Sequence, residues 1–189
     1  MTPGRREALI LGAAGVAAAA AGFLLGPILL PSTNGSGVGV GVGEGAATGN
    51  IALRSASLVD LAGRPRRLSE WQGRILVCNF WATWCAPCRE EIPLLMAARK
   101  KYEPRGVEIV GIAVDNASKV RDFSLTFNIS YPILLAESDG PDLMRRLGNS
   151  VGGLPYTVVA DRQGNLVHRK LGAFKGADLD SILGPLARG

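Results

Sequence analysis

The 189-residue sequence predicts an α/β fold, a three-layer sandwich around a mixed central β-sheet. Three observations lead to this prediction. Short apolar runs, as expected of buried strands, alternate with segments of helical spacing. The run Val107–Val114 (VEIVGIAV) is apolar almost throughout, which is typical of a strand buried on both faces. The last two predicted strands are joined by a short turn and followed by a helix, so the predicted sheet is mixed.

The N-terminal part of the chain has the features of an export segment. Arg5 and Arg6 precede residues 8–30, none of which is charged. As a helix at ~1.5 Å per residue, residues 8–30 would span about 34 Å, enough to cross a bilayer. The positive charge before it predicts residues 1–7 in the cytoplasm and the rest outside. A cleaved signal peptide ending near Ala19–Ala21 and a twin-arginine signal are alternatives, and all three export the domain.

Residues 31–50 are predicted to form a flexible linker to a globular domain at 51–189. Glycine occupies nearly every other position in its central part, which leaves little side chain to bury. The Gly-Val alternation resembles a strand pattern, but so Gly-rich a strand would be weak. We therefore expect a spacer that holds the domain away from the membrane.

The elements of the domain follow from apolar runs and turn signals. The first are a short edge strand at 56–61, a turn at 62–65 and its return at 66–68, then the strand 75–81 and a helix that begins near Cys85. After Val107–Val114 come a helix at 119–127, strands at 131–135, 157–160 and 166–171, and a short helix at 142–147 that Gly148 ends. Leu179, Ile182, Leu183 and Leu186 line one face of a closing helix.

Two cysteines stand where the strand 75–81 leads into the next helix. Cys85 and Cys88 are three residues apart, so they share a helix face and can close a small disulfide ring. Cys85 would lie among the free N–H groups at the positive end of the helix dipole, which stabilise a thiolate. This pattern favours thiol–disulfide exchange, in which Cys85 attacks and Cys88 resolves the mixed disulfide.

Two structural alternatives compete with exchange at this pair. The cysteines could form a permanent disulfide, or they could be half of a zinc site. A structural zinc site normally has four ligands, and only Cys78 and His168 are available in addition. Cys78 lies in an apolar strand and is expected to fill the core, and His168 is expected to be structural.

The segment NFWATWCAPCREEIP resembles the active-site segment of the thioredoxin superfamily. More narrowly, it resembles the membrane-anchored TlpA/ResA/CcmG-like thiol–disulfide oxidoreductases of the bacterial periplasm, and the resemblance covers roughly residues 51–187. It implies a thioredoxin-like fold with an N-terminal β-hairpin and a central helix–strand insertion. It also implies a single-pass protein of the bacterial inner membrane whose catalytic domain is periplasmic.

The resemblance also assigns roles to individual residues. Pro155 resembles the cis-proline beside the active site, and a cis bond would expose the backbone of Leu154 for pairing with a substrate strand. Asn79 occupies the position of a buried aspartate and cannot titrate. Its implied substitute is Glu91, three residues after Cys88, which would tune the thiol pKa or carry a proton.

Further positions around the cysteines are expected to contact the substrate or to set the redox potential. The expected substrate contacts are Trp84, Ala86, Pro87 and Leu154, while Trp81 is expected to pack in the core. In thioredoxin-like proteins a proline between the cysteines accompanies reducing members, so Pro87 predicts a reductant.

The resulting hypothesis is a periplasmic oxidoreductase that mainly reduces protein disulfides, with no cofactor beyond the Cys85–Cys88 disulfide and no metal. The resemblance implies clients such as apocytochromes c or copper-site assembly proteins, and a membrane electron donor of the DsbD/CcdA type. The alternatives are a disulfide-forming oxidase, a copper-binding chaperone module and a peroxiredoxin. The cysteine spacing argues against the copper module, and Ala82 stands where a peroxiredoxin needs Thr or Ser.

Composition excludes two other classes of protein. Three cysteines are too few for a disulfide-stapled scaffold. The net charge of +5 comes from short basic groups with no aromatic RNA-reading motif among them, so we expect no nucleic-acid partner.

Overall fold

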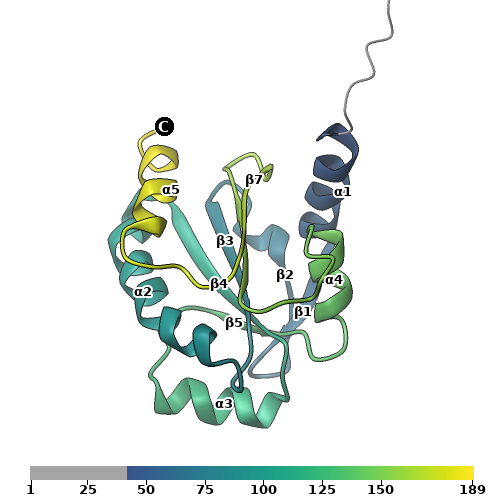
Figure 1. The fold of residues 1–189 in the computed structure, drawn as a ribbon, viewed down its shortest axis with the longest axis vertical. Helices are drawn as coiled ribbons and strands as arrows, with labels where there is room; N and C mark the ends of the chain where they lie inside the picture. The colour runs from purple at the N-terminus through teal and green to yellow at the C-terminus, as the bar shows by residue number, and fades with distance from the viewer. Residues whose placement is uncertain (1–41) are drawn as a thin grey trace, which may run out of the picture. The chain divides into compact units, whose positions relative to one another are not determined.

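The computed structural model describes residues 42–189, which form one seven-stranded sheet with helices on both of its faces (Figure 1). The strands are β1 (Ser57–Asp60), β2 (Pro65–Arg67), β3 (Ile75–Trp81), β4 (Val107–Ala113), β5 (Ile133–Leu135), β6 (Tyr156–Ala160) and β7 (Leu166–Leu171). The helices are α1 (Val42–Ser55), α2 (Ala86–Tyr102), α3 (Ala117–Thr126), α4 (Gly140–Arg146) and α5 (Asp178–Leu186). Two short 3₁₀ helices cover Leu68–Trp71 and Glu103–Arg105.

The sheet is mixed, as predicted. Its strand order is β2-β1-β5-β4-β3-β6-β7. Strands β3, β4 and β5 are parallel to one another, whereas the other neighbouring pairs are antiparallel. Strands β1 and β2 form the predicted N-terminal hairpin, and the predicted insertion is α3 with β5, which lies between β1 and β4 in the sheet. The predicted fold class is therefore confirmed.

Strands β3 and β4 lie at the centre, and every residue of both is buried. Alternate side chains of β3 enter two apolar clusters on opposite faces of the sheet. Val77 and Trp81 pack with residues of α2 and α5, and Cys78 and Phe80 pack with residues of α1 and α4. The continuous apolar runs in the sequence thus reflect a sheet that helices cover on both faces (Figure 1).

The predicted linker is wrong from Val42 onward, because helix α1 begins there and belongs to the domain. Ala52 and Leu53 are buried, and α1 contacts α4 and β7. Gly49 permits this close approach, since a Cβ at that position would lie 2.7 Å from Leu166 Cδ1. The Asn50 side chain accepts a hydrogen bond from the Leu166 N–H (2.8 Å). Part of the glycine content therefore serves close packing rather than flexibility.

Two further predictions concern residues that precede the described part of the chain. The predicted membrane segment, 8–30, and the first part of the predicted linker, 31–41, lie outside the described residues. Among residues 42–189, no helix combines the length and the apolar character needed to cross a bilayer.

The contribution of α1 to stability can be measured by truncating one buried side chain. Leu53→Ala should lower the free energy of unfolding by about 2–4 kcal/mol, because it leaves a cavity in the cluster beneath α1. Ile51→Ala in the same helix is the matched control, since Ile51 is 67% exposed, and it should change stability by less than about 0.5 kcal/mol. Urea unfolding of the oxidised protein measures both. Equal effects of the two variants would mean that α1 does not pack on the domain.

Candidate active site

The candidate site lies at the junction of β3 and α2. The chain turns at Ala82, whose carbonyl accepts a hydrogen bond from the Cys85 N–H (3.2 Å). Cys85 caps the N-terminus of α2, and its Sγ accepts a hydrogen bond from the Cys88 N–H (3.3 Å). Pro87 occupies the first turn of the helix, where its missing N–H leaves no bond unmade. The predicted helix start is confirmed.

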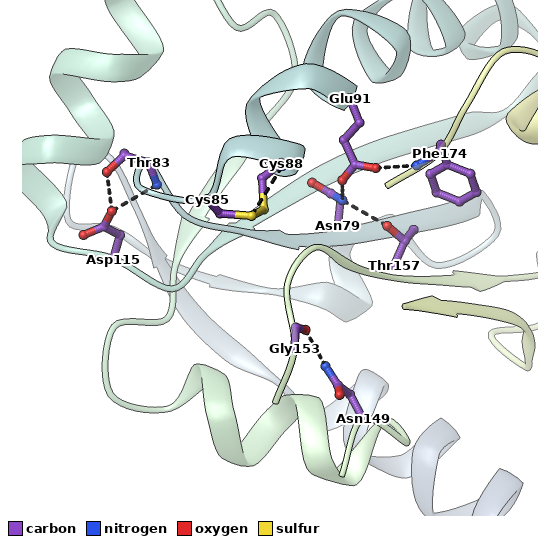
Figure 2. Close-up of a disulfide and its surroundings, with 10 residues drawn as sticks. All are labelled: Asn79, Thr83, Cys85, Cys88, Glu91, Asp115, Asn149, Gly153, Thr157 and Phe174. Carbon is purple, nitrogen blue, oxygen red and sulfur yellow. Dashed lines mark hydrogen bonds between the residues drawn. A yellow bond between two sulfur atoms is a disulfide. The ribbon is translucent and has the colours of Figure 1, made fainter. Parts of the chain in front are cut away.

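Cys85 and Cys88 are joined by a disulfide (Figure 2). Both residues belong to the apolar cluster beneath α2. Cys85 is 5% exposed and Cys88 is fully buried, so Cys85 is the more accessible of the pair. Trp84, directly before Cys85, is 67% exposed, whereas Trp81 is buried and packs on Phe123. The two tryptophans lie as the sequence analysis expected.

The turn before Cys85 is held by a carboxylate that the sequence analysis did not single out. Asp115, just after β4, accepts hydrogen bonds from the backbone N–H (3.0 Å) and the hydroxyl of Thr83 (Figure 2). Burial by itself would raise the pKa of Asp115, but the bonds from Thr83 and Asn116 outweigh it and hold the pKa below its usual value. The Thr83 hydroxyl is thus engaged by Asp115, and the position where a peroxiredoxin needs Thr or Ser is Ala82, which has no hydroxyl.

Glu91 lies one turn beyond Cys88 and is buried, with 1% of its surface exposed. Its Oε1 accepts a hydrogen bond from Asn79 Nδ2 (2.7 Å), and its Oε2 accepts one from the Phe174 N–H (2.9 Å). Asn79 Nδ2 also donates to Thr157 Oγ1 (2.9 Å). The carboxylate therefore links α2 to β3, to β6 through Asn79, and to the segment after β7 (Figure 2).

The environment of Glu91 favours its protonated form. Burial raises the pKa of Glu91 above its ordinary value. The bonds from Phe174 and Asn79 and the positive charge of Lys170 oppose this effect without cancelling it. With 1% of its surface exposed, Glu91 is not an ordinary surface glutamate. Thr157, Phe174 and Lys170 carry no motif of their own, and only the fold brings them to Glu91.

The predicted cis-proline is present, since the Leu154–Pro155 peptide bond is cis. Leu154 packs against the apolar cluster that contains both active-site cysteines. The carbonyl of Pro155 accepts a hydrogen bond from the Gly172 N–H (2.8 Å), which fixes the proline to the end of β7.

Cys78 and His168 lie apart from the disulfide. Cys78 is fully buried on the other face of the sheet, in the cluster with α1 and α4, and burial raises the pKa of its thiol far above the usual value. His168 lies on the edge strand β7, where burial and the charge of Lys170 lower the pKa of the imidazole. Within residues 42–189, no three His, Cys, Asp or Glu side chains gather as metal ligands would.

Comparison with known proteins gives consistent matches. A model of the AhpC/TSA family matches residues 49–169. The thiol-disulfide oxidoreductase ResA of Geobacillus thermodenitrificans is 34% identical over 127 residues, which cover 67% of this chain and 71% of ResA. The thioredoxin-like protein YneN of Bacillus subtilis is 28% identical over 131 residues, or 67% of this chain and 74% of YneN.

The fold has matches among solved structures as well. A thiol:disulfide interchange protein of the thioredoxin family from Chlorobium tepidum superposes with a TM-score of 0.61 at 33% identity. The match covers 70% of this chain and 92% of that one. The predicted thioredoxin-like fold and the resemblance to ResA are confirmed.

The raised pKa of Glu91 has a measurable effect on stability. Because the folded-state pKa lies above the unfolded value of about 4.3, Glu91 contributes stability that is full below pH ~4 and is lost as the pH rises through the folded-state pKa. The difference in unfolding free energy between the wild type and Glu91→Gln should therefore fall as the pH rises from about 4 to 7.

Urea unfolding of the oxidised proteins across this range measures the difference. Glu90→Gln, at the exposed neighbouring position of the same helix, is the control and should show no such trend. If the difference in unfolding free energy between the wild type and Glu91→Gln is constant with pH, the raised pKa of Glu91 is contradicted.

Proposed function

The chain belongs to the AhpC/TSA family and is a ResA/CcmG-like thiol–disulfide oxidoreductase of the thioredoxin superfamily, and on this premise we propose that it reduces disulfides of exported proteins. The observation that carries the proposal is the placement of Cys85, which caps α2 with its sulfur beside a backbone N–H and is the more exposed member of the pair. A sulfur at a helix N-terminus is stabilised as the thiolate, the form that attacks a disulfide.

The proposed reaction starts from the reduced pair. The Cys85 thiolate attacks one sulfur of a client disulfide, which forms a mixed disulfide and displaces the other client sulfur as a thiolate that takes up a proton. Cys88 then loses its proton and attacks Cys85 Sγ, and the second client thiol leaves. The client gains two electrons and two protons, and the protein ends with the Cys85–Cys88 disulfide seen in the structure.

In this scheme Glu91 receives the proton of Cys88. Cys88 is fully buried, so water reaches its thiol poorly, and a base within the protein is needed. Glu91 follows Cys88 by three residues on the same helix and is buried with it. Its raised pKa brings the carboxylate closer to the pKa of a thiol, which eases the transfer. Asn79 holds Glu91 but cannot itself titrate.

The surface around Cys85 supplies the proposed contacts with the client. Trp84, Ala86 and Pro87 are exposed around the cysteine, and an extended client segment would lie across them. The segment would pair with the backbone of Leu154, next to the cis-proline. Backbone pairing and apolar contact select an unfolded cysteine-containing segment over a folded surface.

The remaining parts of the proposal come from the sequence. Residues 8–30 would anchor the chain in the bacterial inner membrane, with the domain in the periplasm. A DsbD/CcdA-type membrane protein would return the disulfide to the dithiol form. The proposed clients are apocytochromes c or copper-site assembly proteins with oxidised cysteine pairs. A disulfide-forming oxidase is the second candidate, because the same pair carries out the reverse reaction if its potential is high.

The order of the two thiols can be tested by trapping. Cys88→Ala, reduced and mixed with a peptide that contains an oxidised cysteine pair, should accumulate a mixed disulfide through Cys85, since nothing resolves it. Mass spectrometry should show the mass of protein plus peptide, and a reductant should abolish that species. Cys85→Ala is the matched control and should trap little, because Cys88 is buried. If both variants trap the peptide equally, the assigned order of attack is wrong.

The direction of electron flow can be tested by the reduction potential of the pair. Equilibration of the wild-type protein with glutathione buffers should give a value near that of thioredoxin, about −270 mV, because Pro87 separates the cysteines. A value near that of the strong oxidant DsbA, about −120 mV, would replace the reductant by the oxidase alternative.

A further inference from the structure

Three buried polar atoms on one face of the sheet have no hydrogen-bond partner among residues 42–189. They are Asn79 Oδ1, Trp81 Nε1 and the Tyr131 hydroxyl. All three side chains lie on the side of the sheet that α2 covers, and Asn79 donates a hydrogen bond to Glu91 there. An unpaired buried polar atom is costly, so three in one place indicate a shared partner.

The rings of Trp81 and Tyr131 meet above Gly111, which is the strand partner of Asn79. Asn79 and Gly111 are direct neighbours in the β3–β4 pair. A Cβ on Gly111 would lie 2.9 Å from Trp81 Nε1 and 2.9 Å from Tyr131 Cε2. Cε2 is bonded to the ring carbon that carries the hydroxyl, so the polar edges of both rings approach the same point. Because Gly111 has no side chain, the rings of Trp81 and Tyr131 can approach the strand at this position.

The orientation of Asn79 directs its free oxygen to the same place. Its Nδ2 donates to Thr157 on β6, and β6 and β4 flank β3 on opposite sides. The other arm of the amide, Oδ1, is therefore directed toward β4 and Gly111. Figure 2 shows Oδ1 pointing away from Thr157.

We propose that Asn79, Trp81 and Tyr131 together bind one buried water molecule above Gly111. The indole N–H only donates and the amide oxygen only accepts, so the bound species has to accept from one and donate to the other. Water does both, and the Tyr131 hydroxyl gives it the third hydrogen bond that is typical of buried waters. A cation would face the Trp81 N–H, and an anion would face Asn79 Oδ1 and the nearby carboxylate of Glu91, so neither ion fits.

The bound water has a consequence for Glu91. By holding Oδ1, it keeps Nδ2 of Asn79 directed at the Glu91 carboxylate, where the amide stabilises the negative charge. Without the water, only the bonds from Nδ2 to Glu91 and Thr157 hold the amide, and its orientation toward Glu91 is less strongly fixed. Burial raises the pKa of Tyr131, and the negative charge of Glu91 adds to this, which agrees with a short separation between the two groups. Asn79, Trp81 and Tyr131 are thus positioning residues for Glu91.

The water itself can be observed in the unmodified, oxidised protein. A crystal structure at a resolution that shows ordered solvent should contain a water within hydrogen-bond distance, roughly 3 Å, of all three atoms. In solution, the Trp81 indole proton should show a nuclear Overhauser effect to water of long residence. An ordered site without this water would overturn the proposal.

The effect on Glu91 is tested with Tyr131→Phe, which removes one partner of the water and keeps the ring. The Glu91 carboxyl carbon, titrated by NMR in the oxidised protein, should show a pKa higher than in the wild type by about half a unit or more. Tyr156→Phe removes a buried hydroxyl on the other face of the sheet, where it donates to the Leu147 carbonyl, and should leave Glu91 unchanged.

An unchanged titration in Tyr131→Phe, or an equal change in the Tyr156→Phe control, would overturn the role of the water. The importance of this role for catalysis rests on the proposed function of Glu91. Neither measurement depends on reductase activity, so a failure here leaves the proposed function standing. A potential near that of DsbA, in turn, would leave the water site intact.

Discussion

The buried carboxylate of Glu91 is the contact on which the arrangement of the site depends. It is enclosed between α2 and the sheet, and a charged or polar group in that position has to be paired. Asn79 on β3 and the backbone N–H of Phe174 provide the pairing. The same bonds therefore fix the register of α2 over the central strand and attach the segment after β7 to the helix that carries the disulfide.

The accessibility of the two sulfurs follows from the same geometry. Helix α2 starts just after β3 leaves the sheet, so its N-cap lies at the rim of the domain and the side chains from Cys88 onward enter the core. Cys85 occupies the rim and Cys88 the core. Asp115, just after the neighbouring strand β4, accepts a hydrogen bond from the Thr83 N–H and holds the turn before Cys85. In the proposed reaction, a client therefore meets the sulfur of Cys85, and the sulfur of Cys88 reacts only within the protein.

Much of the fold and of the site was predictable from local patterns. The apolar runs of β3 and β4, the hairpin at the N-terminus of the domain and the start of α2 at Cys85 follow from periodicity and helix signals. The spacing of Glu91 from Cys88 placed the two on one helix face. Three features were not predictable, because each depends on residues far apart in the chain. They are the burial of Glu91, the buried polar atoms near Gly111 that have no hydrogen-bond partner, and the hydrogen bond from Thr83 to Asp115.

Helix α1 shows most directly that composition alone does not predict whether a segment is flexible. A Gly-rich stretch predicts flexibility when only local freedom is considered. Gly49, however, is part of a helix that lies against β7, and the contacts of this helix with the rest of the domain keep the segment helical.

The sequence alone therefore determined the family of folds, the pair of cysteines that forms the disulfide and the order of elements, since these depend on spacing along the chain. Only the tertiary structure decided which polar groups are buried, and it thereby decided that the pKa of Glu91 is raised. Desolvation and hydrogen bonding are set by neighbours in space rather than in sequence.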